Sequence, residues 1–484
     1  MDAKDNPMNK TNQTRRDFLK NMSSAFLGSA ILGRSCFGEG ARRPNVVFIL
    51  TDDQGTLDAN CFGSTDLYTP AIDKIAANGV RFTQAYAHTV CCPARAMLMT
   101  GRYPQRANVN SWQQGRMRGP KGLNMFLSEV TVAETLQNAG YRTGLFGKWH
   151  LGAHPDHGPK EQGFDEFFGI RDGFIDNYVH YQLHGRGYHD LYEGTKEVFH
   201  RGEYFPDLIT DRALSFIERN QDVPFFLYFA LNIPHYPEQS LARHGRRYEH
   251  LPEPRRSYAA MISTTDDYIG RILTQLEALK LVDDTIIVFM GDNGHSEEDY
   301  QIRGDHHTSG YPRGHNYGAN GGGGNTGRWI GSKGTFLEGG IRTPAILSYP
   351  RKLTKGIARD QAVTAMDWYP TALELCGVEI PTGLELDGRS VLPLIRDDGA
   401  PSRYAVMHWQ WQKAWMVREG EWKLIVNGRQ RIDGKRAEAV YLANLADEKP
   451  EGKNHAKQHP DIVERLTRLH DQWAQAVTPK EPQQ

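Results

Sequence analysis

Three apolar runs rich in β-branched and aromatic residues constrain the fold of this 484-residue chain more than any other feature. They cover residues 46–50, 225–230 and 286–290, and none alternates apolar with polar residues as a half-exposed strand does. Such runs are typical of strands buried on both faces. Because helix signals lie between them, we expect a large, mostly parallel α/β sheet flanked by helices. Ligands of such sheets bind at the carboxyl ends of the strands.

Capping residues mark the helices between these runs. Thr69, followed by a proline, offers an N-cap for a helix that Asn78 and the next glycine end. Thr131 and Glu134 have the spacing of a capping box, and Gly140 ends that second helix. These helices support the α/β assignment.

The sequence pattern changes after about residue 383. Short strand-like runs then predict three antiparallel strands, at residues 404–408, 414–418 and 422–426. A helical spacing of apolar residues follows over residues 461–476. We therefore predict a large α/β domain at residues 43–383 and a smaller α+β domain with an antiparallel sheet at residues 384–484.

The first 42 residues have the pattern of an export signal. Arg15 and Arg16 precede Phe-Leu-Lys and a weakly apolar stretch, a combination typical of twin-arginine signals; an amphipathic helix is the alternative. The stretch is too short and too rich in Gly and Ser to span a bilayer. We expect residues 1–42 to be a signal peptide, the twin-arginine translocase to be a partner, and the mature protein to be periplasmic or secreted. Cys36 fits a lipoprotein cleavage box only loosely, so lipidation is not expected.

Charge and cysteine content exclude several classes of protein. The chain carries 57 Lys and Arg against 58 Asp and Glu, a net charge of −1 at pH 7. No excess positive charge is available to hold nucleic-acid phosphates. Five cysteines in so long a chain are too few for a disulfide framework. We therefore expect no nucleic-acid partner and no stable membrane insertion.

Two of the predicted buried strands end in pairs of possible metal ligands. Asp52 and Asp53 follow the first run, and Asp292 and Asn293 follow the third. Three carboxylates and an amide, with no His or Cys beside them, suit a hard cation such as Ca²⁺ or Mg²⁺ better than zinc. An Asp after a strand is often only a turn former. The repetition at two strand ends makes a metal site an equal alternative.

Two adjacent cysteines begin a predicted helix. Pro93 fits its first turn and Gly101 its end, which places Cys91 and Cys92 at the N-terminus with Arg95 in the first turn. A helix N-terminus of this kind is an anion site. The alternatives are small residues that cap a buried helix, or a reactive thiol with a low pKa.

Further cations and proton carriers are Lys148, His150, His235 and Lys333. Lys148 and His150 lie on one side of an extended segment, and His235 lies just beyond the second apolar run. Each alone is more often structural or solvated. Around one metal and one helix terminus, together they suit the transfer of a tetrahedral anion.

These residues together resemble the formylglycine-dependent sulfatases, sulfuric ester hydrolases of the alkaline-phosphatase-like superfamily. The match is to the signature Cys-x-Pro-x-Arg, here Cys91, Pro93 and Arg95, followed by Thr-Gly-Arg, and it extends along nearly the whole mature chain. The resemblance implies oxidation of Cys91 to formylglycine by a cytoplasmic maturase. It also implies one Ca²⁺ per chain, held beside residue 91 by Asp52, Asp53, Asp292 and Asn293. Ala94, where many relatives have Ser, leaves open which maturase acts.

The resemblance and the chemistry together imply a role for each residue. The hydrated formylglycine at position 91, ionised by the metal and Arg95, attacks sulfur. Lys148 and Lys333 hold the sulfate oxygens. His235 protonates the leaving alcohol, and His150 takes the proton that allows sulfate to be expelled.

Two rival functions differ from this one in residues that can be checked. Phosphonate monoester or phosphodiester hydrolases of the same superfamily resemble a pattern with Asp-His, whereas this chain has Asp292 and Asn293. A silent glycan-binding relative is expected to have lost the nucleophile or a metal ligand, and none is lost here. The expected substrate is a sulfated polysaccharide or oligosaccharide, whose sugar and sulfate position stay open. Rings that could contact it, or could equally be core, are His180, Tyr181, His184, His189, Trp409, Trp411 and Trp415.

Overall fold

The computed structural model describes residues 42–111 and 123–478. Residues 44–484 form one compact unit. The expected signal peptide, with Arg15, Arg16 and Cys36, lies outside the described residues apart from its last position, so the export assignment stays a prediction. Across the two described ranges, no helix is long and apolar enough to cross a membrane.

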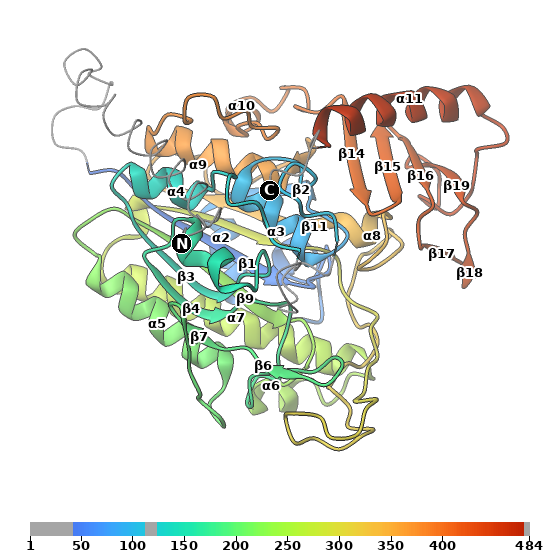
Figure 1. The fold of residues 1–484 in the computed structure, drawn as a ribbon. Helices are drawn as coiled ribbons and strands as arrows, with labels where there is room; N and C mark the ends of the chain where they lie inside the picture. Colours follow the sequence, from blue (N-terminus) through green and yellow to red (C-terminus); the bar gives the residue numbers. More distant parts are fainter. Residues whose placement is uncertain (1–41, 112–122, 479–484) are drawn as a thin grey trace, which may run out of the picture. The chain divides into compact units, whose positions relative to one another are not determined.

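Within the described residues, 11 strands form a mixed sheet around which this unit is organised (Figure 1). Its centre consists of five parallel strands in the order β10 (Thr285–Gly291), β1 (Asn45–Asp52), β9 (Phe225–Pro234), β3 (Arg142–Lys148) and β4 (Glu166–Ile170). The three predicted apolar runs are β1, β9 and β10, which are neighbours and buried throughout. The α/β prediction is therefore confirmed.

Antiparallel strands extend the sheet on both sides of this parallel centre. β11 (Arg342–Ser348) pairs antiparallel with β10 and with β2 (Gly79–Tyr86), and β7 (Tyr192–Glu193) pairs antiparallel with β4 and with β8 (Lys196–Glu197). The edge beyond β2 is formed by β12 (Ile357–Arg359) and β13 (Val363–Thr364). The five central strands are thus flanked by antiparallel pairs, while β12 and β13 pair parallel with β2 at the edge, and the predicted ligands lie at the parallel centre.

Successive side chains of the central strands enter two different cores. On β1, Phe48 packs with α3 (Cys91–Thr100), α4 (Val132–Asn138) and α9 (Trp368–Cys376). Its neighbour Ile49 packs with α2 (Pro70–Ala77), α5 (Phe205–Arg219) and α7 (Arg255–Ala278). Because helices cover both faces, neither face of β1 needs polar residues. This explains the continuous apolar runs.

Both predicted N-cap positions are confirmed, but only one of the two side chains makes the capping hydrogen bond. Thr131 and Glu134 make both hydrogen bonds of the capping box at α4. Thr69 occupies the N-cap position of α2, but its hydroxyl bonds to Asn60. The Asp266 carboxylate of α7 instead accepts hydrogen bonds from the backbone N–H groups of Ala71 and Ile72, the second and third residues of α2, at 2.9 and 2.8 Å. A capping carboxylate from a distant helix leaves no role for the local hydroxyl.

The C-terminal region carries a second, antiparallel sheet in the described part of the chain. Its strands are β14 (Val406–Trp411), β15 (Ala414–Glu419), β16 (Trp422–Val426) and β19 (Val440–Asn444). α11 (Pro460–Val477) packs on it through Leu466. The three predicted strands and the helix are present, whereas β19 was not predicted. The boundary near residue 383 stays a prediction.

The remaining elements are short. They are α6 (Ala242–Arg247), α8 (Glu338–Ile341), α10 (Leu392–Arg396), and the hairpins β5–β6 (Tyr181–Gln182, Tyr188–His189) and β17–β18 (Arg431–Ile432, Lys435–Arg436). Short 3₁₀ turns are Asn60–Phe62, Pro155–His157, Pro159–Gln162, Val282–Asp284 and Ala365–Asp367. The longest segment without a helix or strand in the described residues joins β10 to α8 and covers residues 292–337.

A buried ion cluster joins the small sheet to the main one. Lys423 on β16 donates to Glu338 Oε1 and Glu451 Oε1, both at 2.8 Å, and all three side chains are fully buried. Tyr86 on β2 donates to Glu338 Oε2 at 2.6 Å. Burial raises the pKa of the Glu338 carboxyl, but the Lys423 ammonium outweighs burial and holds that pKa at about 2. Glu338 begins α8, five residues after Lys333.

Candidate active site

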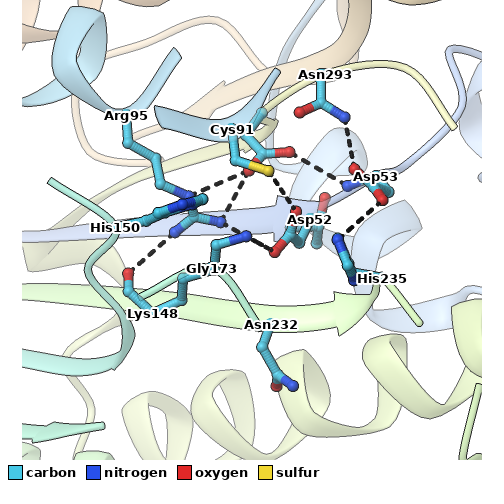
Figure 2. A network of polar contacts seen from close by, with 12 residues as sticks. Asp52, Asp53, Cys91, Arg95, Lys148, His150, Gly173, Asn232, His235 and Asn293 are labelled. Carbon is cyan, nitrogen blue, oxygen red and sulfur yellow. Dashed lines mark hydrogen bonds and ion pairs between the residues drawn. The ribbon is translucent and has the colours of Figure 1, made fainter. Parts of the chain in front are cut away.

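The parallel register of β1 and β10 brings the two predicted ligand pairs together. Thr51 lies opposite Gly291, so Asp52 and Asp53 leave β1 beside Asp292. Carboxylate oxygens of these three aspartates and the sulfur of Cys91 all lie within 4.8 Å of one another, and all four side chains are buried. Figure 2 shows Asp52, Asp53 and Cys91 together. The strand ends therefore meet as predicted.

The helix that begins with the cysteines points at the same place. Cys91 is the first residue of α3, and its Sγ lies 3.5 Å from Asp52 Oδ1. Arg95, one turn later, donates to Asp292 Oδ2 at 3.1 and 2.9 Å. Burial and the Asp52 carboxylate raise the pKa of the Cys91 thiol well above its usual value. This direction is opposite to that of a reactive thiol with a low pKa.

Two lysines complete the positive side of the site. Lys148, the last residue of β3, contacts Asp52 Oδ2 through its fully buried ammonium. Lys333 Nζ lies 2.8 Å from Asp53 Oδ2 and 3.2 Å from Glu298 Oε2. Burial lowers the pKa of both ammonium groups, but the neighbouring carboxylates outweigh it and raise the pKa overall. Both lysines are therefore charged at neutral pH.

The oxygen atoms at this point fit a hard divalent cation. Burial and the neighbouring Asp52 charge raise the pKa of Asp292 to about 7, and burial also raises that of Asp53 to about 6. A positive charge among them would favour their ionised forms. Asn293 donates to Asp53 at 2.6 Å, and its buried Oδ1 has no hydrogen-bond partner among residues 42–111 and 123–478. Burying an oxygen atom without a partner costs folding free energy, and this cost is offset when a bound ligand contacts the oxygen.

A second group of possible metal ligands shares Asp53 with the first but offers fewer oxygen ligands. Asp53, His235 and Glu298 have ligand atoms within 4.8 Å of one another. The Lys333 ammonium lies between the two carboxylates and supplies their positive charge. The three aspartates with Asn293 therefore form the single cation site that the described residues favour.

His235 lies at the edge of this site with a defined ring orientation. It follows β9 directly, and its Nδ1 lies 2.6 Å from the Tyr236 carbonyl oxygen, so the ring donates its Nδ1 proton there. The other nitrogen, Nε2, faces Asp53 Oδ2 at 3.6 Å. Burial, reinforced by the Lys333 charge, lowers the pKa of His235 to about 3. The ring is neutral in the absence of substrate.

His150 lies on the other side of the cysteine helix. Its Nε2 is 3.2 Å from Cys92 Sγ and 3.7 Å from Asp172 Oδ1. Burial, with the Lys148 charge, lowers the pKa of His150 well below its usual value. A Cβ atom on Gly173 would lie 2.9 Å from the ring, so only glycine allows this close packing. The ring contacts the neighbour of the predicted nucleophile.

Two carboxylates of this region were not predicted. Asp172 follows β4, and Glu298 lies on the long segment after Asn293. The one sequence feature that could have predicted Asp172 is its position directly after a strand, the same feature that predicted Asp52 and Asp292. Glu298 has no local signal at all, because an irregular segment brings it to Lys333.

Most of the candidate sugar-contacting rings belong to the protein's packing. Trp409 and Trp411 are 3% and 5% exposed and lie in the core beneath the small sheet. Trp415 stacks on His470 with ring centroids 4.0 Å apart. His184, in contrast, contacts Phe174, which stacks on His235.

A family model named Sulfatase matches residues 44–378, more than half of the chain. The chain belongs to the sulfatase family. A second model, the C-terminal part of N-sulphoglucosamine sulphohydrolase, matches residues 328–457. The family resemblance expected from the sequence is thus confirmed, and the protein is a sulfuric ester hydrolase.

The relatives of this sulfatase are matched over most of their length. Arylsulfatase J of Mus musculus is 28% identical over 91% of this chain and 77% of its own. N-acetylgalactosamine-6-O-sulfatase of Bacteroides thetaiotaomicron is 27% identical over 89% of this chain and 92% of its own. The crystal structure of Ps i-CgsB, 27% identical, has a TM-score of 0.74 and covers 90% of this chain and 93% of that one. The same values hold for its complex with k-i-k-neocarrahexaose.

The oxygen-rich site predicts stabilisation by hard cations. Adding Ca²⁺ to metal-stripped protein should raise its thermal unfolding temperature, because a ligand at 100 times its Kd stabilises the folded state by about 2.7 kcal/mol. Differential scanning calorimetry over a Ca²⁺ series measures this. Asn293→Ala should need at least about tenfold more Ca²⁺ for the same shift, since one ligand is lost. Asn220→Ala, at the end of α5, is the control. A larger response to Zn²⁺ than to Ca²⁺ would contradict the ligand assignment.

Proposed function

We propose that this sulfatase hydrolyses sulfate esters of a sulfated glycan, using formylglycine at position 91 and one calcium ion. The observation that carries the proposal is the position of Cys91 at the N-terminus of α3, 3.5 Å from Asp52 and one turn before Arg95. Buried carboxylates, cations and the helix N-terminus surround that one side chain. This is the environment in which a nucleophile can attack an anionic ester.

The modified residue and the ion supply chemistry that ordinary side chains lack. Formylglycine, as its hydrate, offers one hydroxyl to attack sulfur and a second whose deprotonation expels sulfate, and calcium draws charge from the sulfate oxygens. Asp52, Asp53, Asp292 and Asn293 would hold the ion beside residue 91. A thiol or a serine hydroxyl could attack once but could not release the product in this way.

The chain's own residues hold the sulfate group and move the protons. Lys148 and Lys333 bind sulfate oxygens, where negative charge grows during the reaction, and Arg95 keeps Asp292 in place. His235 protonates the leaving alcohol at Nε2, since its Nδ1 is committed to the Tyr236 carbonyl. His150 accepts the proton whose loss releases sulfate. The charge of bound sulfate raises the pKa of His235 toward the range that this role needs.

A carbohydrate substrate is supported by the relatives. Ps i-CgsB was crystallised with k-i-k-neocarrahexaose, and the Bacteroides thetaiotaomicron relative is named for a sulfated amino sugar. We infer the same broad class of substrate here. His184 contacts Phe174, which stacks on His235, so we assign His184 as a contact for the leaving sugar.

We further propose that the protein is modified in the cytoplasm and then exported folded. The paired Arg15 and Arg16 before a weakly apolar stretch support the twin-arginine route to the periplasm or beyond. Because that route carries folded proteins, a cytoplasmic formylglycine-generating maturase has to act on Cys91 first. The buried position of Cys91 supports this order, since an enzyme cannot reach it after folding.

The nucleophile proposal is tested at Cys91 by mass spectrometry. Protein produced with a competent maturase should carry an aldehyde at position 91 and a free thiol at Cys92. Cys91→Ala should abolish hydrolysis of aryl sulfates, while Cys92→Ala, its matched control, should still acquire the aldehyde. An active enzyme whose Cys91 is wholly unmodified would refute the proposal.

The two histidines should respond differently to the leaving group. His235→Ala should lower kcat/KM for a sugar sulfate at least tenfold more than for 4-nitrophenyl sulfate, whose phenolate leaves without protonation. His150→Ala should slow both substrates alike and give a burst of alcohol equal to the enzyme present, followed by slow turnover. Rapid-mixing kinetics measure both. Equal losses for both substrates in His235→Ala, with no burst in His150→Ala, would refute these roles.

Export should depend on the first arginine pair. Changing Arg15 and Arg16 together to Lys should leave a folded, active precursor in the cytoplasm, as measured by cell fractionation and immunoblotting. Changing Arg42 and Arg43 to Lys is the matched control and should leave export intact. Equal export of both variants would contradict the twin-arginine assignment.

A further inference from the structure

Glu298 is the outermost charged group of the active site. From the inside outward, the exposed fraction of the side chain rises from 1% for Asp53 to 3% for His235, 11% for Lys333 and 30% for Glu298. A carboxylate oxygen of Glu298 lies within 4.8 Å of a ring nitrogen of His235. A leaving group protonated by His235 therefore meets the Glu298 carboxylate as it extends toward solvent.

The Glu298 carboxylate is fixed and charged. Ser296 donates to its Oε2 at 2.9 Å, and the Glu298 N–H donates back to the Ser296 hydroxyl at 3.1 Å. Lys333 Nζ lies 3.2 Å from the same oxygen. Burial raises the pKa of Glu298, but the Lys333 charge outweighs burial and brings the pKa to about 2. An anion is thus present at this position throughout the neutral range.

A small cleft gives this carboxylate access to a ligand. The residues that line it include Asp53, His235, Tyr236, Tyr258, Ser296 and Glu298. The lining thus includes both His235, which we assign to the leaving group, and Glu298, the most exposed of the charged groups. The group attached to the scissile oxygen is therefore the part of the substrate nearest to this carboxylate.

The charges of the site balance for a substrate with one negative charge. The ion-paired group holds four carboxylates and three cations, namely Asp52, Asp53, Asp292 and Glu298 with Arg95, Lys148 and Lys333. Glu238 lines the same cleft, but burial raises the pKa of its carboxyl to about 7, so it is left out of this balance. A bound calcium ion converts the single excess negative charge into a single excess positive charge. One sulfate ester then neutralises the site. Without Glu298, the loaded site would hold one more positive charge and would attract a second anion.

We propose that Glu298 selects sulfate esters whose neighbouring position carries a hydroxyl, and rejects those that carry a second sulfate or a carboxylate there. A hydroxyl donates a hydrogen bond to the carboxylate, whereas a second anion meets a like charge at short range in a partly buried site. This inference rests on the proposed function, because it uses the same sulfate position. It adds the chemistry of the adjacent group.

The test compares two aryl sulfates that differ only beside the ester. Matured enzyme is assayed with 2-hydroxyphenyl sulfate, which has a neighbouring hydroxyl that is neutral at pH 7, and with 2-carboxyphenyl sulfate, which has a neighbouring carboxylate. Glu298→Gln should raise the ratio of kcat/KM for the carboxylate over the hydroxyl substrate at least tenfold. Glu297→Gln removes the same charge from the adjacent, exposed residue and should leave the ratio within twofold. Raising the salt concentration should shrink the difference between wild type and Glu298→Gln.

A binding measurement shows whether Glu298 selects between the two substrates when they bind or only changes the rate at which they are hydrolysed. Cys91→Ala cannot turn over, so isothermal titration with both aryl sulfates reports affinity alone. Adding Glu298→Gln to Cys91→Ala should strengthen binding of the carboxylate substrate at least tenfold relative to the hydroxyl one.

The failure of this inference and that of the proposed function give different results. Equal losses for both substrates in Glu298→Gln, with the ratio unchanged, would show that Glu298 only holds Lys333, and would overturn the inference alone. No hydrolysis of either substrate by matured wild-type enzyme would overturn the proposed function and the inference with it. An equal rise in the ratio for Glu297→Gln would also refute a specific role for Glu298.

Discussion

Concentrated buried charge is the constraint on which the rest of this structure depends. Asp52 and Asp292 arrive on adjacent parallel strands, which places two like charges side by side where water cannot screen them. Such a pair is tolerated only if cations lie within a few ångströms. Arg95 and Lys148 come from a helix and a strand that are distant in sequence, so the folded chain has to bring them together. The fold and the charge balance of the site therefore require each other.

The regular part of the site could be read from the sequence. Asp52 and Asp292 end uninterrupted apolar runs, and parallel strands present their carboxyl ends at one edge. Cys91 and Arg95 are one helical turn apart, so they share a face. The apolar runs and the helical spacing thus predict where each of these residues lies on its own strand or helix. Because the strands are buried and parallel, the sequence also predicts that Asp52 and Asp292 lie close together.

The irregular parts could not be read in this way. Glu298 lies on a long segment without helix or strand, so no spacing in the sequence predicts its contact with Lys333. Asp266 caps α2 from nearly 200 positions away, and this replaced the Thr69 cap that local sequence favoured. Trp409 and Trp411 are aromatic residues of the kind that bind sugars, but they belong to β14 and are buried in the core between the small sheet and α8. In each case, a long-range packing contact outweighed a local pattern.

The buried Lys423 ammonium has a consequence for how this chain can change over evolutionary time. Its two carboxylate partners flank the small sheet in the sequence: Glu338 precedes the first strand of the sheet, and Glu451 follows the last one. A recombination event that replaced the sheet alone would leave Glu338 facing a foreign partner and without its counter-charge in a dry interior. The two segments are therefore expected to be inherited together, and any change at Lys423 to require a matching change on α8.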